Sequence, residues 1–149
     1  MSGVLYRASR GYVAIFYAVL AGWTVGLVPL ALSRASALST MFVAMIAFFT
    51  AYSWYWCLGI AYRIALEEDG RLEFTSLRRR LWAHAREVKR VEGPALPIGW
   101  GFIRFRLERA WIHAFYVETR ALQQILTGLR AANGEVRLKN LPRRPVETG

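Results

Sequence analysis

The first 60 residues of this 149-residue chain contain no aspartate and no glutamate. All ten acidic residues follow Ile60, although 55% of the chain is apolar and its formal net charge is +10. Basic residues are also sparse there, because 23 uncharged residues separate Arg10 from Arg34 and another 28 separate Arg34 from Arg63. About 20 apolar residues cross the roughly 30 Å hydrocarbon core of a bilayer, so both stretches are long enough to span one. The alternative is a pair of buried helices in a globular protein, but such helices rarely run this far without a charge.

The sequence therefore predicts a two-helix transmembrane anchor over residues 1–61, with spans at about 12–32 and 38–60. The connection between the spans is short, so they form an antiparallel hairpin with both termini on one side of the membrane. Several arginines flank the hairpin on that side, whereas the connecting loop carries only Arg34. The positive-inside rule then places both termini in the cytoplasm. We expect a multi-pass membrane protein.

Cysteine is nearly absent from the chain. Cys57 is the only one and lies in the second predicted span, so no intrachain disulfide forms and the redox compartment is not indicated. Residues 35–37 (Ala-Ser-Ala) have the form of a signal-peptide cleavage site. The apolar stretch before them is about twice the usual 7–15 residues of a signal core, and a second span follows at once. These observations favour an uncleaved anchor.

Small residues recur every fourth position in the first predicted span, at Ala18, Gly22 and Gly26. Such a stripe lets another helix approach closely. The helix that packs against this stripe is either the second span, which we regard as the simpler interpretation, or a helix of another protein.

The hydrophobic pattern changes from helical to alternating after residue 61. Asp69-Gly70 between two alternating runs is a strong β-hairpin signal. Breaker residues predict a loop over 93–99. The expected strands cover about 62–66, 72–74, 81–85, 88–92, 103–107 and 111–116, with a last short strand around Val136 and Leu138.

One soluble helix is expected after these strands. Glu118 or Thr119 is suited to cap its start, and Asn133-Gly134 is suited to end it. An apolar stripe at helical spacing predicts that the helix packs on the sheet or into the mouth of a barrel. The stripe consists of Leu122, Ile125, Leu126 and Leu129. The sequence thus predicts an α+β membrane protein with a β domain over residues 62–140 and a flexible tail over 141–149.

Three segments of this domain resemble the bacterial pleckstrin-homology-like domains of small membrane proteins. They are Arg63–Phe74 as the first hairpin, Arg86–Glu92 as the strand before the long loop, and Phe102–Arg106 as the strand after it, followed by the closing helix Thr119–Asn133. The resemblance covers about residues 62–139 and rests on hydrophobic patterns. It implies a seven-stranded bent barrel capped at one end by the helix, and it implies no single activity. Some relatives are envelope or photosynthetic-complex assembly proteins. Together with the predicted spans, the resemblance implies a multi-pass protein of the bacterial inner (cytoplasmic) membrane.

The sequence contains no recognisable catalytic constellation. His84 and His113 are the only histidines, and no His/Cys pair has metal-ligand spacing. Both histidines lie on expected strands and could meet, but a lone histidine on a strand has many structural uses. Asp69, the only aspartate, is explained by its turn. We therefore expect a protein that is not an enzyme and carries no metal or cofactor; an enzyme or transporter component is the weaker alternative.

The basic residues give the best functional clue. From Tyr62 onward the chain has 17 Lys+Arg against 10 Asp+Glu. Each basic group near an anionic leaflet contributes about 1 kcal/mol to membrane attraction. The alternatives are a solvated loop that serves only as a topology signal, and nucleic-acid binding, which the membrane tether and the lack of aromatic–basic interleaving disfavour. The candidate lipid- or partner-binding residues are Arg63, Arg71, Arg78, Arg79 and Arg80.

Trp100, between two glycines at the end of the predicted loop, is a further candidate anchor for a membrane or partner unless it folds back onto the barrel. Gly99-Trp100-Gly101 lacks the lysine of a phosphate-binding loop. We expect a non-enzymatic, membrane-anchored module that binds anionic lipid headgroups, a partner membrane protein, or both. The alternative is a structural accessory subunit or assembly factor of a larger membrane complex, such as a bioenergetic or photosynthetic one.

Overall fold

A computed structural model describes residues 3–33, 40–95 and 99–141 of the chain. The chain divides into two compact units, residues 10–59 and residues 60–149 together with the first nine. The predicted connecting loop around Arg34, and most of the predicted tail, lie outside the described residues.

The first unit consists of two long apolar helices, α1 (Arg10–Ser33) and α2 (Thr40–Cys57). Both are long and apolar enough to cross a membrane by length and composition. Two polar contacts join them: the Trp54 indole N–H donates to the Thr24 hydroxyl at 2.8 Å, and the Tyr17 hydroxyl donates to the Cys57 carbonyl at 2.7 Å. The second contact satisfies a carbonyl in the last turn of α2, which has no partner within its own helix.

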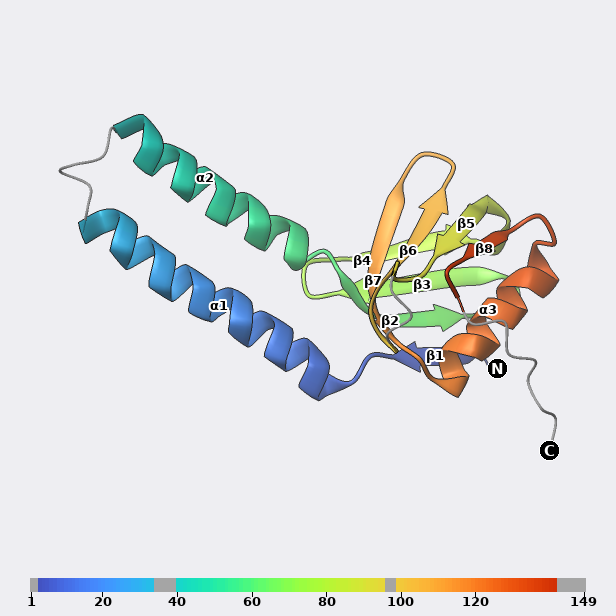
Figure 1. Ribbon diagram of the computed structural model, residues 1–149. Coiled ribbons are helices and arrows are strands. Elements are labelled where there is room, and N and C mark those ends of the chain that lie inside the picture. The colour runs from blue at the N-terminus through green and yellow to red at the C-terminus, as the bar shows by residue number, and fades with distance from the viewer. Residues whose placement is uncertain (1–2, 34–39, 96–98, 142–149) are drawn as a thin grey trace. The chain divides into compact units, whose positions relative to one another are not determined.

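The second unit is an eight-stranded mixed sheet with one helix (Figure 1). Two antiparallel meanders, β2-β3-β4 and β5-β6-β7, meet where β2 and β7 run parallel at Ala61 and Ala114. Their bounds are β2 Ala61–Leu66, β3 Arg71–Ser76, β4 Arg80–His84, β5 Val88–Glu92, β6 Trp100–Leu107 and β7 Trp111–Val117. The short strand β8 (Arg137–Lys139) pairs parallel to β5 at one edge. These positions confirm the predicted strands to within a few residues.

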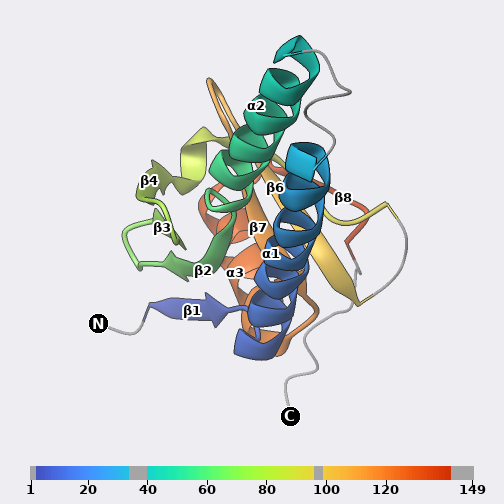
Figure 2. The same ribbon diagram turned by 90° about the vertical axis from the view of Figure 1, so that its left-hand side faces the viewer.

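The chain begins with a strand that the sequence analysis did not predict. Residues Val4–Arg7 form β1, which pairs antiparallel with β2 (Figure 2). Tyr6 is fully buried, and its hydroxyl donates to the Phe115 carbonyl at 2.9 Å and accepts from the Val117 N–H at 2.9 Å. Assigning residues 1–61 to the anchor alone was therefore wrong for β1. The described residues also contain eight strands, one more than the resemblance implies.

Helix α3 (Arg120–Ala132) packs on β1 and β2, as Figure 1 shows at the right of the sheet. Its N-cap is Thr119, whose hydroxyl accepts from the Leu122 N–H, and its C-cap is Asn133. All four residues of the predicted apolar stripe are buried, so a helix capping the sheet is confirmed. At Gly128 an added Cβ would lie 2.7 Å from the Leu66 side chain, which is why the helix can approach β2 closely.

The β2–β3 turn forms as predicted at Asp69-Gly70. Gly70 has a positive φ of 81°, which glycine adopts without strain. The Asp69 carboxylate accepts a hydrogen bond from the Arg71 N–H at 3.0 Å. A single 3-10 turn, Ala85–Glu87, joins β4 to β5, and the Ala85 N–H donates to the Gly70 carbonyl at 2.8 Å. The 85–87 turn and the β2–β3 turn therefore lie at the same end of the sheet.

Candidate functional site

Three arginines share one row across the first four strands. Arg7 on β1 pairs with Arg63 on β2, Arg63 pairs with Thr75 on β3, and Thr75 pairs with Arg80 on β4. Directly paired residues of an antiparallel sheet project from the same face. The sheet therefore gathers side chains from residues 7, 63 and 80 on its outer face, although the chain separates them by up to 73 positions.

The turn between β3 and β4 adds two more arginines at the same end of the sheet. Ser76 pairs with Ala61, the first residue of β2, so this turn lies beside the point where β2 begins. The Ser76 hydroxyl accepts from the Arg79 N–H at 3.1 Å and donates to the Arg79 carbonyl at 2.8 Å, which fixes the turn. Hereafter the basic end denotes Arg7, Arg63, Arg78, Arg79 and Arg80.

The basic end has little acidic compensation. Glu73 is the only acidic residue in strands β1–β4, and it pairs with Arg80 at 4.0 Å. The Nε atom of Arg63 is buried and has no hydrogen-bond partner among the described residues. A desolvated guanidinium donor without a partner is costly. The exposed guanidinium groups of Arg7, Arg79 and Arg80 also leave a positive potential that attracts anions at the protein surface.

Exposed apolar side chains accompany the basic end. Leu77 lies in the turn beside Arg78 and is 57% exposed. Leu5 on β1 and Trp82 on β4 are also exposed, and they occupy the next row of the same outer face, in register with Ala65 and Glu73. Arginine beside exposed leucine and tryptophan is the composition that suits a membrane–water interface. The sequence analysis missed Arg7, Leu5, Leu77 and Trp82, although an apolar residue directly before three arginines was a usable signal.

Arg71, Trp100 and the two histidines lie elsewhere in the unit. Arg71 begins β3 at the opposite end of β2 from Ala61 and pairs with Asp69 at 3.7 Å, so it is not part of the basic end. Trp100 begins β6 opposite Val117 and is 57% exposed, so it does not fold back into the core.

His84 has a structural role, because its Nδ1 accepts from the Arg86 N–H at 3.3 Å and caps the 3-10 turn. His113 lies on β7 opposite Arg104, where burial and the Arg104 charge lower the pKa of its imidazole. Within residues 3–33, 40–95 and 99–141, no group of three His, Cys, Asp or Glu side chains could hold a metal ion. The expectation that the chain carries no cofactor and is not an enzyme stays a prediction.

The small-residue stripe of α1 does not contact α2. Ala18, Gly22 and Gly26 are all exposed, and a Cβ added at either glycine would meet no atom within 4 Å. Contact with α2 instead runs through Tyr17 and Thr24. The interpretation that the second helix fills this stripe was therefore wrong.

In comparisons with known proteins, no family model, no curated protein and no solved structure matches this chain. Its function is inferred from its own geometry and chemistry.

Proposed function

We propose that this chain is a membrane-anchored, pleckstrin-homology-like module whose basic end binds anionic lipid headgroups at the cytoplasmic face of the bacterial inner membrane. The observation that carries the proposal is the row of arginines at one end of the sheet. At this end the chain leaves β1 for α1 and returns from α2 into β2. β1 ends three residues before α1 begins, and β2 begins four residues after α2 ends. Arg7 and Arg63 therefore lie within a few residues of the two apolar helices along the chain.

The chemistry of the basic end fits phosphate headgroups. Arginine presents a planar fork of donors that binds phosphate through two hydrogen bonds at once. Leu77 and Trp82 add apolar surface that suits the boundary between headgroups and acyl chains. The pleckstrin-homology-like assignment is supported by two meanders closed by one C-terminal helix.

The test uses a soluble protein in which residues 1–9 are joined by a short Gly/Ser linker to residues 60–149. Ala8 donates its N–H to the Tyr62 carbonyl at 2.8 Å, so a few residues can bridge this gap. Binding is measured to phosphatidylcholine vesicles with and without phosphatidylglycerol. Each replacement of Arg78, Arg79 or Arg80 by alanine should weaken binding to the anionic vesicles by about 1 kcal/mol, or roughly fivefold, and added salt should weaken it further.

Arg71→Ala is the matched control. It also removes one positive charge, but Arg71 begins β3, whereas Arg78, Arg79 and Arg80 follow the end of that strand. If Arg71→Ala weakens binding as much as Arg79→Ala, the attraction depends on net charge alone and the proposed site is wrong. No preference for anionic vesicles would leave the arginine cluster as a topology signal.

The proposed orientation has its own test. In a Cys57→Ser background, single cysteines are placed at Arg34 and at Gly149, and intact cells are treated with a membrane-impermeant thiol reagent. We expect labelling at residue 34 and protection at residue 149, because the loop carries one arginine and the other side carries many. The reverse pattern would overturn the cytoplasmic placement of the termini.

A second candidate function is that of an accessory subunit or assembly factor of a larger membrane complex. The exposed stripe at Ala18, Gly22 and Gly26 favours it, since small residues on a lipid-facing surface allow close contact with another transmembrane helix. Purification in mild detergent should then yield a stoichiometric complex that Gly22→Leu and Gly26→Leu disrupt. A monomer carrying anionic lipid would select the lipid-binding function alone.

A further inference from the structure

A second basic surface lies on the outer face of β5, β6 and β8, in the other meander. Arg137 on β8 pairs with Arg90 on β5, Arg90 pairs with Arg106 on β6, and Arg106 pairs with Trp111 on β7. Three guanidinium groups therefore project from one face in a single row. Beside this row is a groove of about 820 Å³, which we call the distal groove. Its basic lining residues are Arg86, Lys89, Arg90, Arg106 and Arg137.

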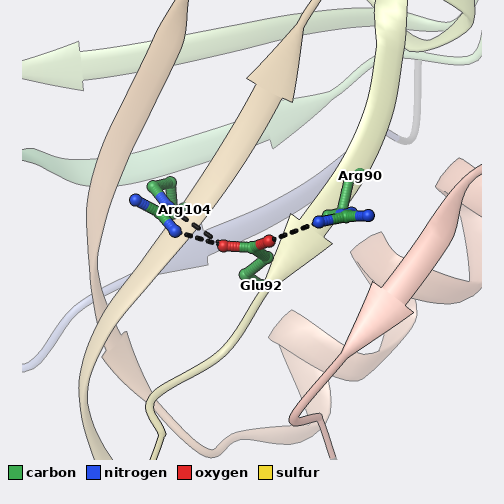
Figure 3. A network of polar contacts seen from close by, with 3 residues as sticks. All are labelled: Arg90, Glu92 and Arg104. Carbon is green, nitrogen blue, oxygen red and sulfur yellow. Dashed lines mark hydrogen bonds and ion pairs between the residues drawn. The ribbon is translucent and has the colours of Figure 1, made fainter.

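Neighbouring side chains hold two arginines of this face in place. The Glu92 carboxylate accepts from Arg90 at 3.0 Å through one oxygen and from Arg104 through the other (Figure 3). The guanidinium carbons of Arg104 and Arg106 lie 4.3 and 5.2 Å from the centre of the Trp111 ring, within the range of cation–π attraction. Side chains fixed before a ligand arrives lose less entropy on binding, so this face is preorganised for a negatively charged ligand.

The distal groove carries a positive surplus with two acidic positions in its lining. Five basic residues line it against Glu108 and Glu135. Lys89 is paired with Glu108 at 3.3 Å and Arg90 with Glu92 at 3.0 Å, so the surplus comes from Arg86, Arg106 and Arg137. A uniformly charged polyphosphate or nucleic-acid backbone would meet repulsion at Glu135, whose charge no ion pair within the described residues offsets. A peptide can place carboxylates against the arginines and neutral or basic side chains against the glutamates, so it complements this mixed pattern better.

The position of the distal groove separates it from the basic end. Arg86 lies in the turn after β4, and Ala85 in that turn is hydrogen-bonded to Gly70 in the β2–β3 turn. β2 has six residues, so its two ends are about 17 Å apart at roughly 3.4 Å per residue. The groove is thus beside the end of β2 opposite the strand ends that join α1 and α2. A ligand here does not compete for the arginines of the basic end.

From this geometry we infer that the distal groove is a docking site for an acidic, aspartate- and glutamate-rich segment of a partner protein. The module then has two basic surfaces with different ligands. The basic end faces headgroups, and the distal groove recruits an acidic protein segment.

The inference is tested on the full chain in nanodiscs of phosphatidylcholine, which supplies no anionic lipid as a competitor. The probe is a fluorescein-labelled dodecapeptide of alternating glutamate and glycine, and binding is measured by fluorescence anisotropy at low and high salt. We expect saturable binding that the double variant Arg86→Glu/Arg137→Glu weakens by at least about tenfold, because like charges then face each other across the interface. The milder pair Arg86→Gln/Arg137→Gln should lie in between.

The matched control is Arg120→Glu/Arg130→Glu, which changes net charge equally at exposed positions of α3 outside both the groove and the basic end. Thermal unfolding verifies that both double variants are folded. Equal weakening by the control would show that the peptide senses only net charge, and would overturn the inference. No peptide binding, or tighter binding of a single-stranded DNA dodecamer or of inorganic polyphosphate, would overturn it as well.

Discussion

Tyr6 provides the sharpest test of the fold, because it joins the unpredicted strand β1 to β7. Its ring is fully buried, and its hydroxyl bridges the Phe115 carbonyl and the Val117 N–H, each at 2.9 Å. Tyr6→Phe keeps the ring and removes only the hydroxyl. Both backbone groups then lose their partner, and an unsatisfied buried polar group costs about 1–3 kcal/mol.

The two losses differ in size. Phe115 is fully buried, so its carbonyl bears most of the desolvation cost, whereas Val117 is only half-buried and water can partly replace the hydroxyl. We therefore expect Tyr6→Phe to lower the free energy of unfolding by about 2–3 kcal/mol. Domains of this size are stable by only about 5–15 kcal/mol, so the loss is readily measured.

The measurement is urea unfolding of the soluble linked protein, followed by far-ultraviolet circular dichroism. Tyr62→Phe is the control, since Tyr62 is a half-buried tyrosine of the partner strand β2. An effect of Tyr6→Phe no larger than that of Tyr62→Phe would mean that β1 is not held as described. Residues 60–149 alone, without β1 and the linker, should be less stable still, because β2 and α3 both lose their contact with β1.

The remaining predictions concern the helix and the titrating groups. Leu126→Ala should lower the free energy of unfolding by about 2–5 kcal/mol in the same assay, because it opens a cavity under α3, and Leu126→Asp should prevent folding. Folding lowers the pKa of His113 from its ordinary value of 6.5. As the pH falls below 6.5, the unfolded state therefore binds a proton at His113 before the folded state does. Stability should therefore fall as the pH drops from 6.5 toward the folded pKa, and His113→Gln should flatten that part of the melting-temperature profile. Hydrogen bonds from Arg104 and Arg90 hold the pKa of Glu92 below 4.5, so its stabilisation is complete above 4.5 and lost as the pH falls through the folded pKa. Glu92→Gln should remove that acid limb, and unchanged profiles in both variants would contradict these assignments.

Local patterns in the sequence were sufficient for most strands and for α3. The Asp69-Gly70 turn determines the β2–β3 hairpin because its geometry depends on two adjacent residues. Likewise, α3 carries its own start signal at Thr119 and its own apolar stripe. Features of this kind are encoded within a few consecutive residues, so periodicity and turn chemistry reveal them.

Non-local pairing was not visible in the sequence. β1 has four residues, and its partner β2 begins more than 50 positions later, so nothing near Val4–Arg7 marks it as a strand. The row of Arg7, Arg63 and Arg80 follows from that same pairing. Sequence reasoning grouped the arginines by proximity along the chain, and so it included Arg71 and omitted Arg7.

The small-residue stripe shows a related limit. Its spacing predicts a surface that permits close helix contact, but not which helix makes the contact. In the described part of the chain, the face of α1 that contacts α2 carries Tyr17 and Thr24. Tyr17 donates a hydrogen bond to the Cys57 carbonyl, and Thr24 accepts one from Trp54. Polar groups on apolar helices gain from having partners, and the spacing of small residues carries no information on where those partners lie.

The pairing of β1 with β2 also gives the two apolar helices a role in folding. Arg7 and Arg63 are direct partners, so residues 8–62 form one loop that must close before β1 can join the sheet. Closing a flexible loop costs entropy that rises with its length. Here the loop consists mostly of α1 and α2, which the Tyr17–Cys57 and Thr24–Trp54 hydrogen bonds hold antiparallel. Under the proposed membrane anchoring, most of the closure entropy is already lost once these helices have formed, because the two ends of the loop are then close together. Insertion of the helices should therefore precede completion of the sheet, and the same closure brings Arg7 next to Arg63 to form the basic end.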